Sequence, residues 1–290
     1  MVRNENFQLE ELTERVREGR TDFSHIHLPP GALDEVKDYP PMQVYLKGAK
    51  WDHQNGKHDE RLIFDDSELA YIKARELHLP YCSARRAVFN RSDLTCATLT
   101  HADLTEASFQ RTILQRANLS YAILASANLA EADLSNTDLS YAVLDGSTIN
   151  DALLHYANCT AASFQDVKLR RAKGLTTATF EGANLSGMDF SGMDLTHAKL
   201  ARANLSRANF EGAKLRKADL TDANLRGAYF VDAELGGAEM AHVNLDGANL
   251  CNSSGLLQAI GIATARITAS TKMNDRERTA LHEIRPTTRH

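Results

Sequence analysis

Residues 117–141 read ANLSYAILASANLAEADLSNTDLSY, which is five consecutive pentapeptides of the form A(D/N)LXX or close to it. We call the leucine position the centre of each pentapeptide. Centres recur every five residues from Leu94 to Leu169 and again from Leu175 to Leu250, which gives 32 centres. Leucine fills 23 of them and phenylalanine six, and alanine lies two residues before 23 of them. This register decides the fold class.

A period of five fits neither common secondary structure. In an α-helix it would spread the apolar residues around the axis, and in a long strand an odd period would alternate them between the two faces. A short extended piece with two inward side chains, followed by a corner, does fit. Stacked coils of this kind pair their backbone groups with the coils above and below.

The pattern resembles the pentapeptide-repeat family, whose consensus is A(D/N)LXX, strongly over 93–250 and more weakly over 62–91. The resemblance implies an all-β fold, a right-handed quadrilateral β-helix (a solenoid) in which four pentapeptides form one coil. The 32 centres then make about eight or more coils. Ala and Leu or Phe are expected to point inward, and Asp or Asn and the two X positions outward. Ser and Thr after the centre are suited to hydrogen-bonding the backbone of the corner.

The sequence divides into three regions around this repeat. Residues 1–60 are predicted to be a small, partly helical N-terminal capping region, because the hydrophobic end of a solenoid needs a cover. Residues 61–254 are the predicted β-helix. Residues 255–290 are predicted to be a C-terminal cap with a short helix and a mobile tail, and the apolar stretch LLQAIGIATARI is a candidate capping or dimerising segment.

The register slips once. The spacing between Leu169 and Leu175 is six residues, and we interpret this slip, near 170–174, as a one-residue bulge with Gly174 as the accommodating residue.

Composition excludes several classes of protein. The chain has 290 residues with a net charge of −5, and no run of about 18 apolar residues, so no membrane-spanning helix is expected. The N-terminus lacks the apolar core of a Sec signal peptide. The four cysteines form no CxxC pair, which indicates a reducing compartment. We therefore expect a cytoplasmic protein, or one exported by a non-Sec route.

The sequence offers no catalytic motif. It lacks a P-loop, a GxGxxG after a strand, a GxSxG and an HExxH. His25, His27, His53 and His58 have a spacing that matches no structural zinc site, so neither a metal nor a cofactor is expected. The predicted protein is not an enzyme.

With four pentapeptides per coil, residues 20 apart lie above one another in a column. Residues 93–166 carry nine acids and two bases, net −7, and 167–230 carry six acids and eleven bases, net +5. Acidic residues in the same columns compensate much of the basic charge, so direct nucleic-acid binding is not expected. The columns that place opposite charges together are Asp194–Lys214–Glu234, Lys199–Asp219–Glu239, Arg202–Asp222 and Arg226–Asp246.

Two aromatic columns are predicted. One points inward as structural core and consists of Phe190, Phe210 and Phe230, with Met188 beside the first. The other faces solvent and is a candidate partner-binding surface. It comprises His101, Tyr121 and Tyr141, with Tyr156 on the neighbouring face and a border of Asp103, Glu106 and Asp138.

These features predict a non-enzymatic protein that binds another protein, with a homodimer through the C-terminal segment as a further interpretation. Two roles stay open. The non-repeat head favours a secreted bacterial effector or signalling scaffold, a type known among proteins that resemble this one. The alternative implied by the resemblance is a protein that binds a type II topoisomerase (DNA gyrase). Partial DNA mimicry would then protect the enzyme against a quinolone or a peptide toxin, and the acids of 93–166 suit that role.

Overall fold

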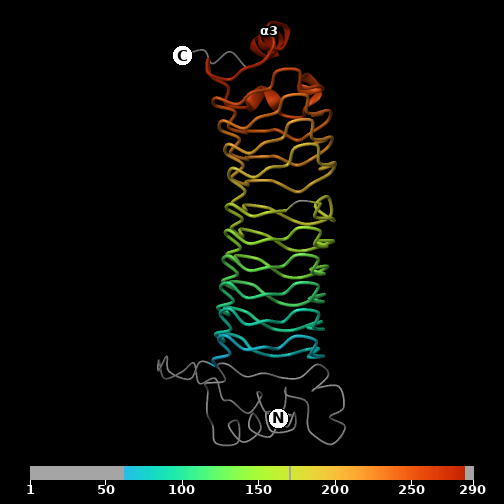
Figure 1. Cartoon of the computed structure of the whole chain (residues 1–290). Coiled ribbons are helices and arrows are strands. Elements are labelled where there is room, and N and C mark those ends of the chain that lie inside the picture. Colours follow the sequence, from blue (N-terminus) through green and yellow to red (C-terminus); the bar gives the residue numbers. More distant parts are fainter. Residues whose placement is uncertain (1–61, 170, 285–290) are drawn as a thin grey trace, which may run out of the picture. The chain divides into compact units, whose positions relative to one another are not determined.

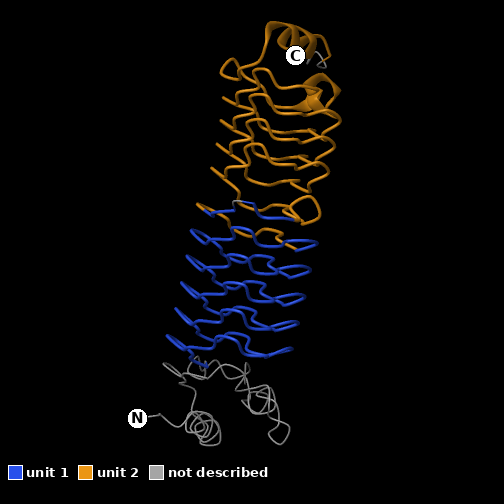
Figure 2. Cartoon of the chain, turned by 45° about the vertical axis from the view of Figure 1, so that its right-hand side comes forward, with its two compact units in different colours: residues 1–157, 167–173 blue, residues 158–166, 174–290 orange. Residues whose placement is uncertain are grey.

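The computed structural model describes residues 62–169 and 171–284, which form stacked coils followed by a C-terminal helix (Figure 1). The chain forms two compact units (Figure 2). Unit 1 contains the described residues of 1–157 and 167–173, and unit 2 contains 158–166 and the described residues of 174–290. The predicted N-terminal cap, including the helix over 5–20, lies outside the described residues.

Each coil of the repeat is made of four pentapeptides. The residue before each centre forms a parallel bridge with the residue 20 positions later, as in the series Asp103, Ile123 and Val143 in unit 1. The Leu104 amide donates to the Ile123 carbonyl at 2.7 Å, and the Ile123 amide donates to the Ala102 carbonyl at 2.9 Å. Each side contributes one paired residue, because the corner that follows leaves no room for a longer strand. The β-helix solenoid expected from the pentapeptide pattern is therefore present in both units.

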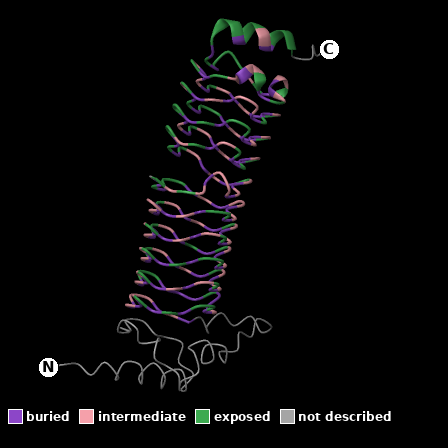
Figure 3. Ribbon diagram, turned by 90° about the vertical axis from the view of Figure 1, so that its right-hand side faces the viewer, coloured by how far each residue is buried: buried purple, intermediate pink, exposed green. Residues whose placement is uncertain are grey.

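The two inward positions build the core. Ala102 and Leu104 in unit 1, and Leu205 in unit 2, are completely buried. In Figure 3 buried residues alternate with more exposed ones along every coil. The predicted inward column is also present: the rings of Phe190 and Phe210 are 5.2 Å apart, and those of Phe210 and Phe230 are 4.8 Å apart. Stacked rings and alanines fill most of the interior, and the few buried hydroxyls at inward positions, such as Thr112 and Thr137, donate to backbone carbonyls.

The corners place their second residue in the left-handed region. At this slot 29 non-glycine residues have φ between 55° and 64°, among them His101 and Tyr156. None of the 29 is valine, isoleucine or threonine, because a branched Cβ clashes in this conformation. The slot also points its side chain away from the core, so it decides what each corner offers to solvent.

The consensus Asp or Asn before the centre fixes the corner. The Asp93 Oδ1 accepts a hydrogen bond from the amide of Thr95 at 3.0 Å and another from its hydroxyl. Our expectation that Ser and Thr after the centre bond the corner backbone was therefore wrong at such corners, where the Asx side chain makes that bond. In unit 2 the side-chain amides of the asparagines at this position also form hydrogen bonds between coils. The Nδ2 of Asn224, for example, donates to the Oδ1 of Asn204 at 3.2 Å.

The register slip begins at Gly174, the residue predicted to accommodate it, at the end of the predicted range 170–174. Leu153 and Lys173 are still bridged at the regular spacing of 20, and the first bridge at 21 joins Asn158 to Thr179. The extra residue therefore lies within the turn 174–178, where the amides of Thr177 and Ala178 both donate to the Gly174 carbonyl at 3.0 Å. Gly174 has φ 86°, which suits glycine and explains why it opens this turn.

Unit 2 continues beyond the regular repeat. Two 3₁₀ turns, η1 (Leu256–Gln258) and η2 (Ile262–Thr264), lengthen successive corners. The spacing between bridged residues grows to 21 at Ile260, 22 at Arg266 and 23 at Lys272. The apolar stretch LLQAIGIATARI is thus part of a wider coil and not a separate segment, since Leu256 and Ile262 point into the core.

The short C-terminal helix predicted from the sequence is α3 (Asp275–Ile284). It contacts both η1 and η2 and buries Leu281 (Figure 1). The described part of the predicted mobile tail is therefore helical, because an amphipathic face with Leu281 covers the last coil. No helix among the described residues is long and apolar enough to cross a membrane.

Glu277 in α3 gives a testable pH effect. The residue is 8% exposed, its Oε2 has no hydrogen-bond partner, and burial raises the pKa of its carboxyl. A raised folded-state pKa stabilises the fold below that pKa, and this contribution is lost as pH rises through it. We therefore expect Glu277→Gln to raise the melting temperature slightly at pH 7 and to have no such benefit near pH 4. Glu283→Gln, on the exposed side of α3, is the control, and an equal gain from both variants would contradict the effect of burial.

Candidate protein-interaction site

One corner of unit 1 carries a continuous stack of exposed rings, Tyr81, His101, Tyr121 and Tyr141, which we call the aromatic column. The ring centroids of successive members are 4.7, 4.8 and 4.8 Å apart, and adjacent rings lie within 12° of parallel. The predicted stacking of His101, Tyr121 and Tyr141 is therefore confirmed. Tyr81 is a fourth member that the sequence analysis missed, although its position 20 residues before His101 is the signal that would have found it.

The backbone holds these rings in place. All four residues take the left-handed corner slot, with φ between 57° and 61°. The Tyr121 amide donates to the Ser140 carbonyl at 2.9 Å, and the His101 amide donates to the Ser120 carbonyl at 3.0 Å. Because each corner is bonded to the next coil, the rings repeat at the spacing of the coils. Tyr121 and Tyr141 remain 48% and 50% exposed even though they cover one another.

Apolar side chains extend this surface onto the adjoining side of the coils. Ile123 follows Tyr121 by two residues, is 42% exposed, and is bridged to Val143, which follows Tyr141 in the same way. Large exposed aliphatic residues beside stacked tyrosines are unusual on a surface that only meets water. Ile123 was not among the predicted site residues, because a single outward Ile in a strand is unremarkable.

The predicted acidic border is present but partly neutralised. The Asp103 carboxylate lies 3.6 Å from the guanidinium of Arg85 and also accepts a hydrogen bond from Thr105. The Asp138 Oδ1 accepts from the Ser140 amide at 3.0 Å. Glu106 lies near Arg86, whose guanidinium donates to both carboxylate oxygens of Asp66. The border is thus less negative than a count of acids suggests.

Tyr156 occupies a different corner. It lies in the column of Arg116 and Asn136, which is separated from the aromatic column by the side that carries Asp138. Tyr156 is 67% exposed, the highest value among the large hydrophobic residues that the structure describes. The structure therefore places Tyr156 beside the aromatic column and not within the stack.

The charge columns of unit 2 exist, but pairing within them differs from our prediction. Asp194, Lys214 and Glu234 are bridged in series, yet none of the ion pairs within 4.0 Å in the described residues joins them. Arg202 contacts Glu181 at 2.9 Å, so the predicted pair with Asp222 was wrong.

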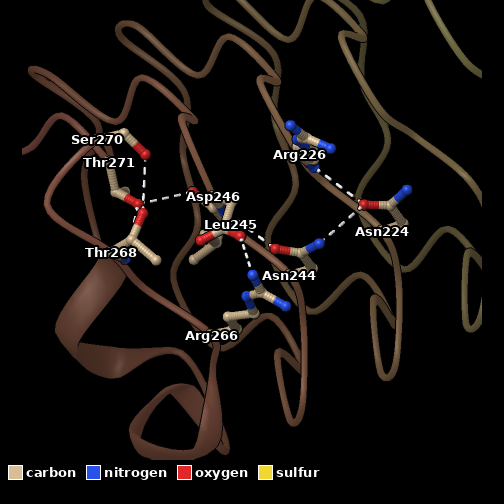
Figure 4. Close-up of polar contacts among 9 residues, drawn as sticks. All are labelled: Asn224, Arg226, Asn244, Leu245, Asp246, Arg266, Thr268, Ser270 and Thr271. Carbon is tan, nitrogen blue, oxygen red and sulfur yellow. Dashed lines mark hydrogen bonds and ion pairs between the residues drawn. The ribbon is translucent and has the colours of Figure 1, made fainter.

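The predicted pair between Arg226 and Asp246 was also wrong. The Asp246 carboxylate is bound at 2.7 Å by Arg266 from the next coil, and Figure 4 shows this contact with Arg226 turned away. Arg202 has one acid on each side, Glu181 and Asp222, and Asp246 has one arginine on each side, Arg226 and Arg266, and the column alone does not choose between them.

Lys214 is therefore expected to contribute little. Hydrogen bonds from Thr196 lower the pKa of Asp194, and the charge of Lys214 is the smallest contribution to that shift. We expect Lys214→Ala to cost on the order of a few tenths of a kcal/mol, and less in high salt, because exposed charges are screened. Thermal melts at low and high salt measure this. A large loss that salt does not reduce would show a different role for the lysine.

Unit 1 contains exposed ion pairs that the sequence analysis did not identify. Arg111 donates two hydrogen bonds to Glu131, at 2.7 and 3.1 Å, and the first of these lowers the pKa of the Glu131 carboxyl. Arg171 binds Asp151 at 2.8 Å in the same column. Their 20-residue spacing is the signal that identifies both pairs, which link consecutive coils along one corner.

The described residues contain no group of three or more His, Cys, Asp or Glu side chains placed to hold a metal ion. The histidines considered for zinc, His25, His27, His53 and His58, lie outside the part of the chain that the structure describes.

Comparisons with known proteins agree with the observed coils. The family model for pentapeptide repeats matches eight copies, in segments that span 79–173 and 175–254. No curated protein matches the chain. Among solved structures, the chain is similar to HetL, a pentapeptide repeat protein involved in heterocyst differentiation regulation from the cyanobacterium Nostoc sp. strain PCC 7120. The identity is 23%, the match covers 89% of this chain and 93% of HetL, and the TM-score is 0.30.

Two further solved structures are similar over part of the chain. Full-length QnrB1, a plasmid-mediated fluoroquinolone resistance protein, has 20% identity, covering 72% of this chain and 97% of QnrB1 with a TM-score of 0.24. A pentapeptide repeat protein of the Arabidopsis thaliana thylakoid lumen has 29% identity, covering 37% of this chain and 65% of that protein with a TM-score of 0.18.

Proposed function

This chain belongs to the pentapeptide-repeat family, and from that premise we propose that it is a non-enzymatic protein that binds another protein through the aromatic column of unit 1. The observation that carries the proposal is the exposed stack of four rings with Ile123 beside it. Tyrosine provides a large contact area and a hydroxyl at low entropic cost, which is why it is enriched in interfaces. Tyr156 and the acids Asp103, Glu106 and Asp138 form the rim of this surface.

The test removes rings without disturbing the core. Tyr121→Ser together with Tyr141→Ser is expected to abolish recovery of the partner in a pull-down, or to reduce the mass by light scattering if the partner is a second copy. Tyr71→Ser together with Tyr229→Ser is the matched control, because these tyrosines are 46% and 39% exposed at other positions. Unchanged recovery and unchanged mass, with an intact melting transition, would leave the aromatic column a purely structural role.

For the biological role we favour a bacterial effector or signalling scaffold, with the non-repeat residues 1–60 carrying delivery or partner information. This role implies a cytoplasmic location, or export by a non-Sec route. The alternative is protection of DNA gyrase by partial DNA mimicry, which the net charge of −7 over 93–166 supports. A gyrase supercoiling assay with a quinolone separates the two, since only a protection protein restores supercoiling in the presence of the drug.

We also propose a domain organisation and an assembly. Residues 61–254 form the regular part of a right-handed β-helix of about eight or more coils, with 1–60 closing one end and 255–290, which continue the coils to Lys272 before α3, closing the other. The C-terminal region supports a homodimer, because Ile260 and Ile284 are 60% and 52% exposed there. Ile260→Asp should convert such a dimer to a monomer by light scattering, whereas the tyrosine variants above should not affect this interface.

A further inference from the structure

A polar groove of about 570 Å³ lies along one corner of unit 2. It follows two adjacent columns, each four coils long. One column places Arg207 among glycines, and the other places Arg226 between Ser206 and Asp246. At a coil spacing of roughly 4.8 Å, the groove spans about 14 Å along the stack. No motif in the sequence indicated this groove.

Glycines in the corner slot create the depression. Gly187 has no atom within 4 Å of where a Cβ would lie, so the corner is open on that side of Arg207. A Cβ on Gly227 would lie 3.7 Å from the Cγ of Arg207, so the stem of this arginine passes over the neighbouring glycine. Arg207 lines the groove, and its stem lies against a corner that has no bulky side chain.

Neither arginine has an acidic partner within the part of the chain that the structure describes. Asp246, the acid in the column of Arg226, is already bound by Arg266 at 2.7 Å. Among the contacts of the described residues, no hydrogen bond or ion pair engages the guanidinium of Arg207 or Arg226, and none engages the Ser206 hydroxyl. The backbones of Arg207 and Arg226 are directly bonded, the Arg207 amide donating to the Arg226 carbonyl at 2.9 Å, so both positive charges lie on adjacent coils.

From these contacts we propose that the groove binds an extended, acidic peptide segment of a partner protein. A guanidinium presents a planar pair of donors that matches a carboxylate, and two of them on adjacent coils suit two acidic side chains. An extended chain covers about 14 Å with roughly four residues, which fits the length of the groove better than a single ion does. The Ser206 hydroxyl supplies a further donor between the two arginines.

The proposal is tested on the full chain by fluorescence anisotropy. The probe is a fluorescein-labelled peptide of six alternating glutamate and serine residues, and the same peptide with glutamine is the neutral control. We expect Arg207→Gln together with Arg226→Gln to raise the Kd for the acidic peptide at least about tenfold. Ser206→Leu, which narrows the groove without changing its charge, is also expected to raise the Kd.

The matched control removes the same charge from the opposite corner of the same coil. Arg216→Gln together with Lys217→Gln is expected to change the Kd by less than about twofold, since these exposed residues are two corners away. Equal losses for the two double variants, or wild-type affinity in the groove variant, would overturn the proposal. So would displacement of the peptide by inorganic phosphate as effectively as by unlabelled peptide, because a single anion would then fill the site.

Discussion

Leu205→Asp is expected to lower the unfolding free energy of unit 2 by several kcal/mol. Leu205 is completely buried, and its neighbours above and below in the column are Leu185 and Leu225, also buried. A carboxylate there would be ionised without a partner in the middle of an apolar stack, or would remain protonated at a similar cost. The expected loss is roughly 3–5 kcal/mol of unfolding free energy.

Urea unfolding followed by circular dichroism measures this loss. Ala201→Asp is the control. Ala201 lies at the corner just before the side of the coil that carries Leu205, and it is partly exposed, so the substitution introduces the same charge where water can reach it. The control is expected to stay within about 0.5 kcal/mol of the wild type. A Leu205→Asp variant that melts like the wild type would mean that the centre positions do not face the core.

Gly255→Ala is the second change with a large expected effect. A Cβ at this position would lie 2.5 Å from the Gly236 nitrogen and 2.6 Å from its Cα. Both are backbone atoms, so no side-chain rotation relieves the contact, and one coil has to move away from the next. Gly255 also has φ 78°, so the substitution adds the conformational cost of placing an alanine in the left-handed region. We expect a loss of roughly 3 kcal/mol or more.

Gly212→Ala separates the two causes. Gly212 has φ 63° and no atom within 4 Å of the place a Cβ would occupy, so its alanine variant carries the backbone cost of about 1–2 kcal/mol alone. Hydrogen exchange adds a local readout, because the Leu235 amide donates to the Ser254 carbonyl at 2.7 Å next to the contact. Loss of protection at Leu235 is expected only in Gly255→Ala. Equal destabilisation by the two variants, with Leu235 still protected, would contradict the close approach.

Much of the fold and part of the candidate site were predictable. Because the family resemblance implies a coil of four pentapeptides, residues 20 apart are expected to be spatial neighbours, and the Phe190 column and the stack from His101 to Tyr141 were identified from that spacing. The same arithmetic predicted Asp246 as the partner of Arg226 and was wrong. Arg266 approaches from the opposite side, at the point where the bridged spacing has grown to 22.

The sequence by itself determined the inward and outward positions, because these depend only on a residue's place within a five-residue repeat, and with the four pentapeptides per coil that the family resemblance implies it also determined the columns. The tertiary structure decided what depends on side-chain direction and on distances finer than a coil. It selected which neighbour each exposed arginine binds, turned the Gly187–Gly227 corner into a groove, and brought Gly255 against Gly236. These outcomes differ by one rotamer or by about an ångström, whereas the repeat specifies position only to the nearest coil spacing of roughly 4.8 Å.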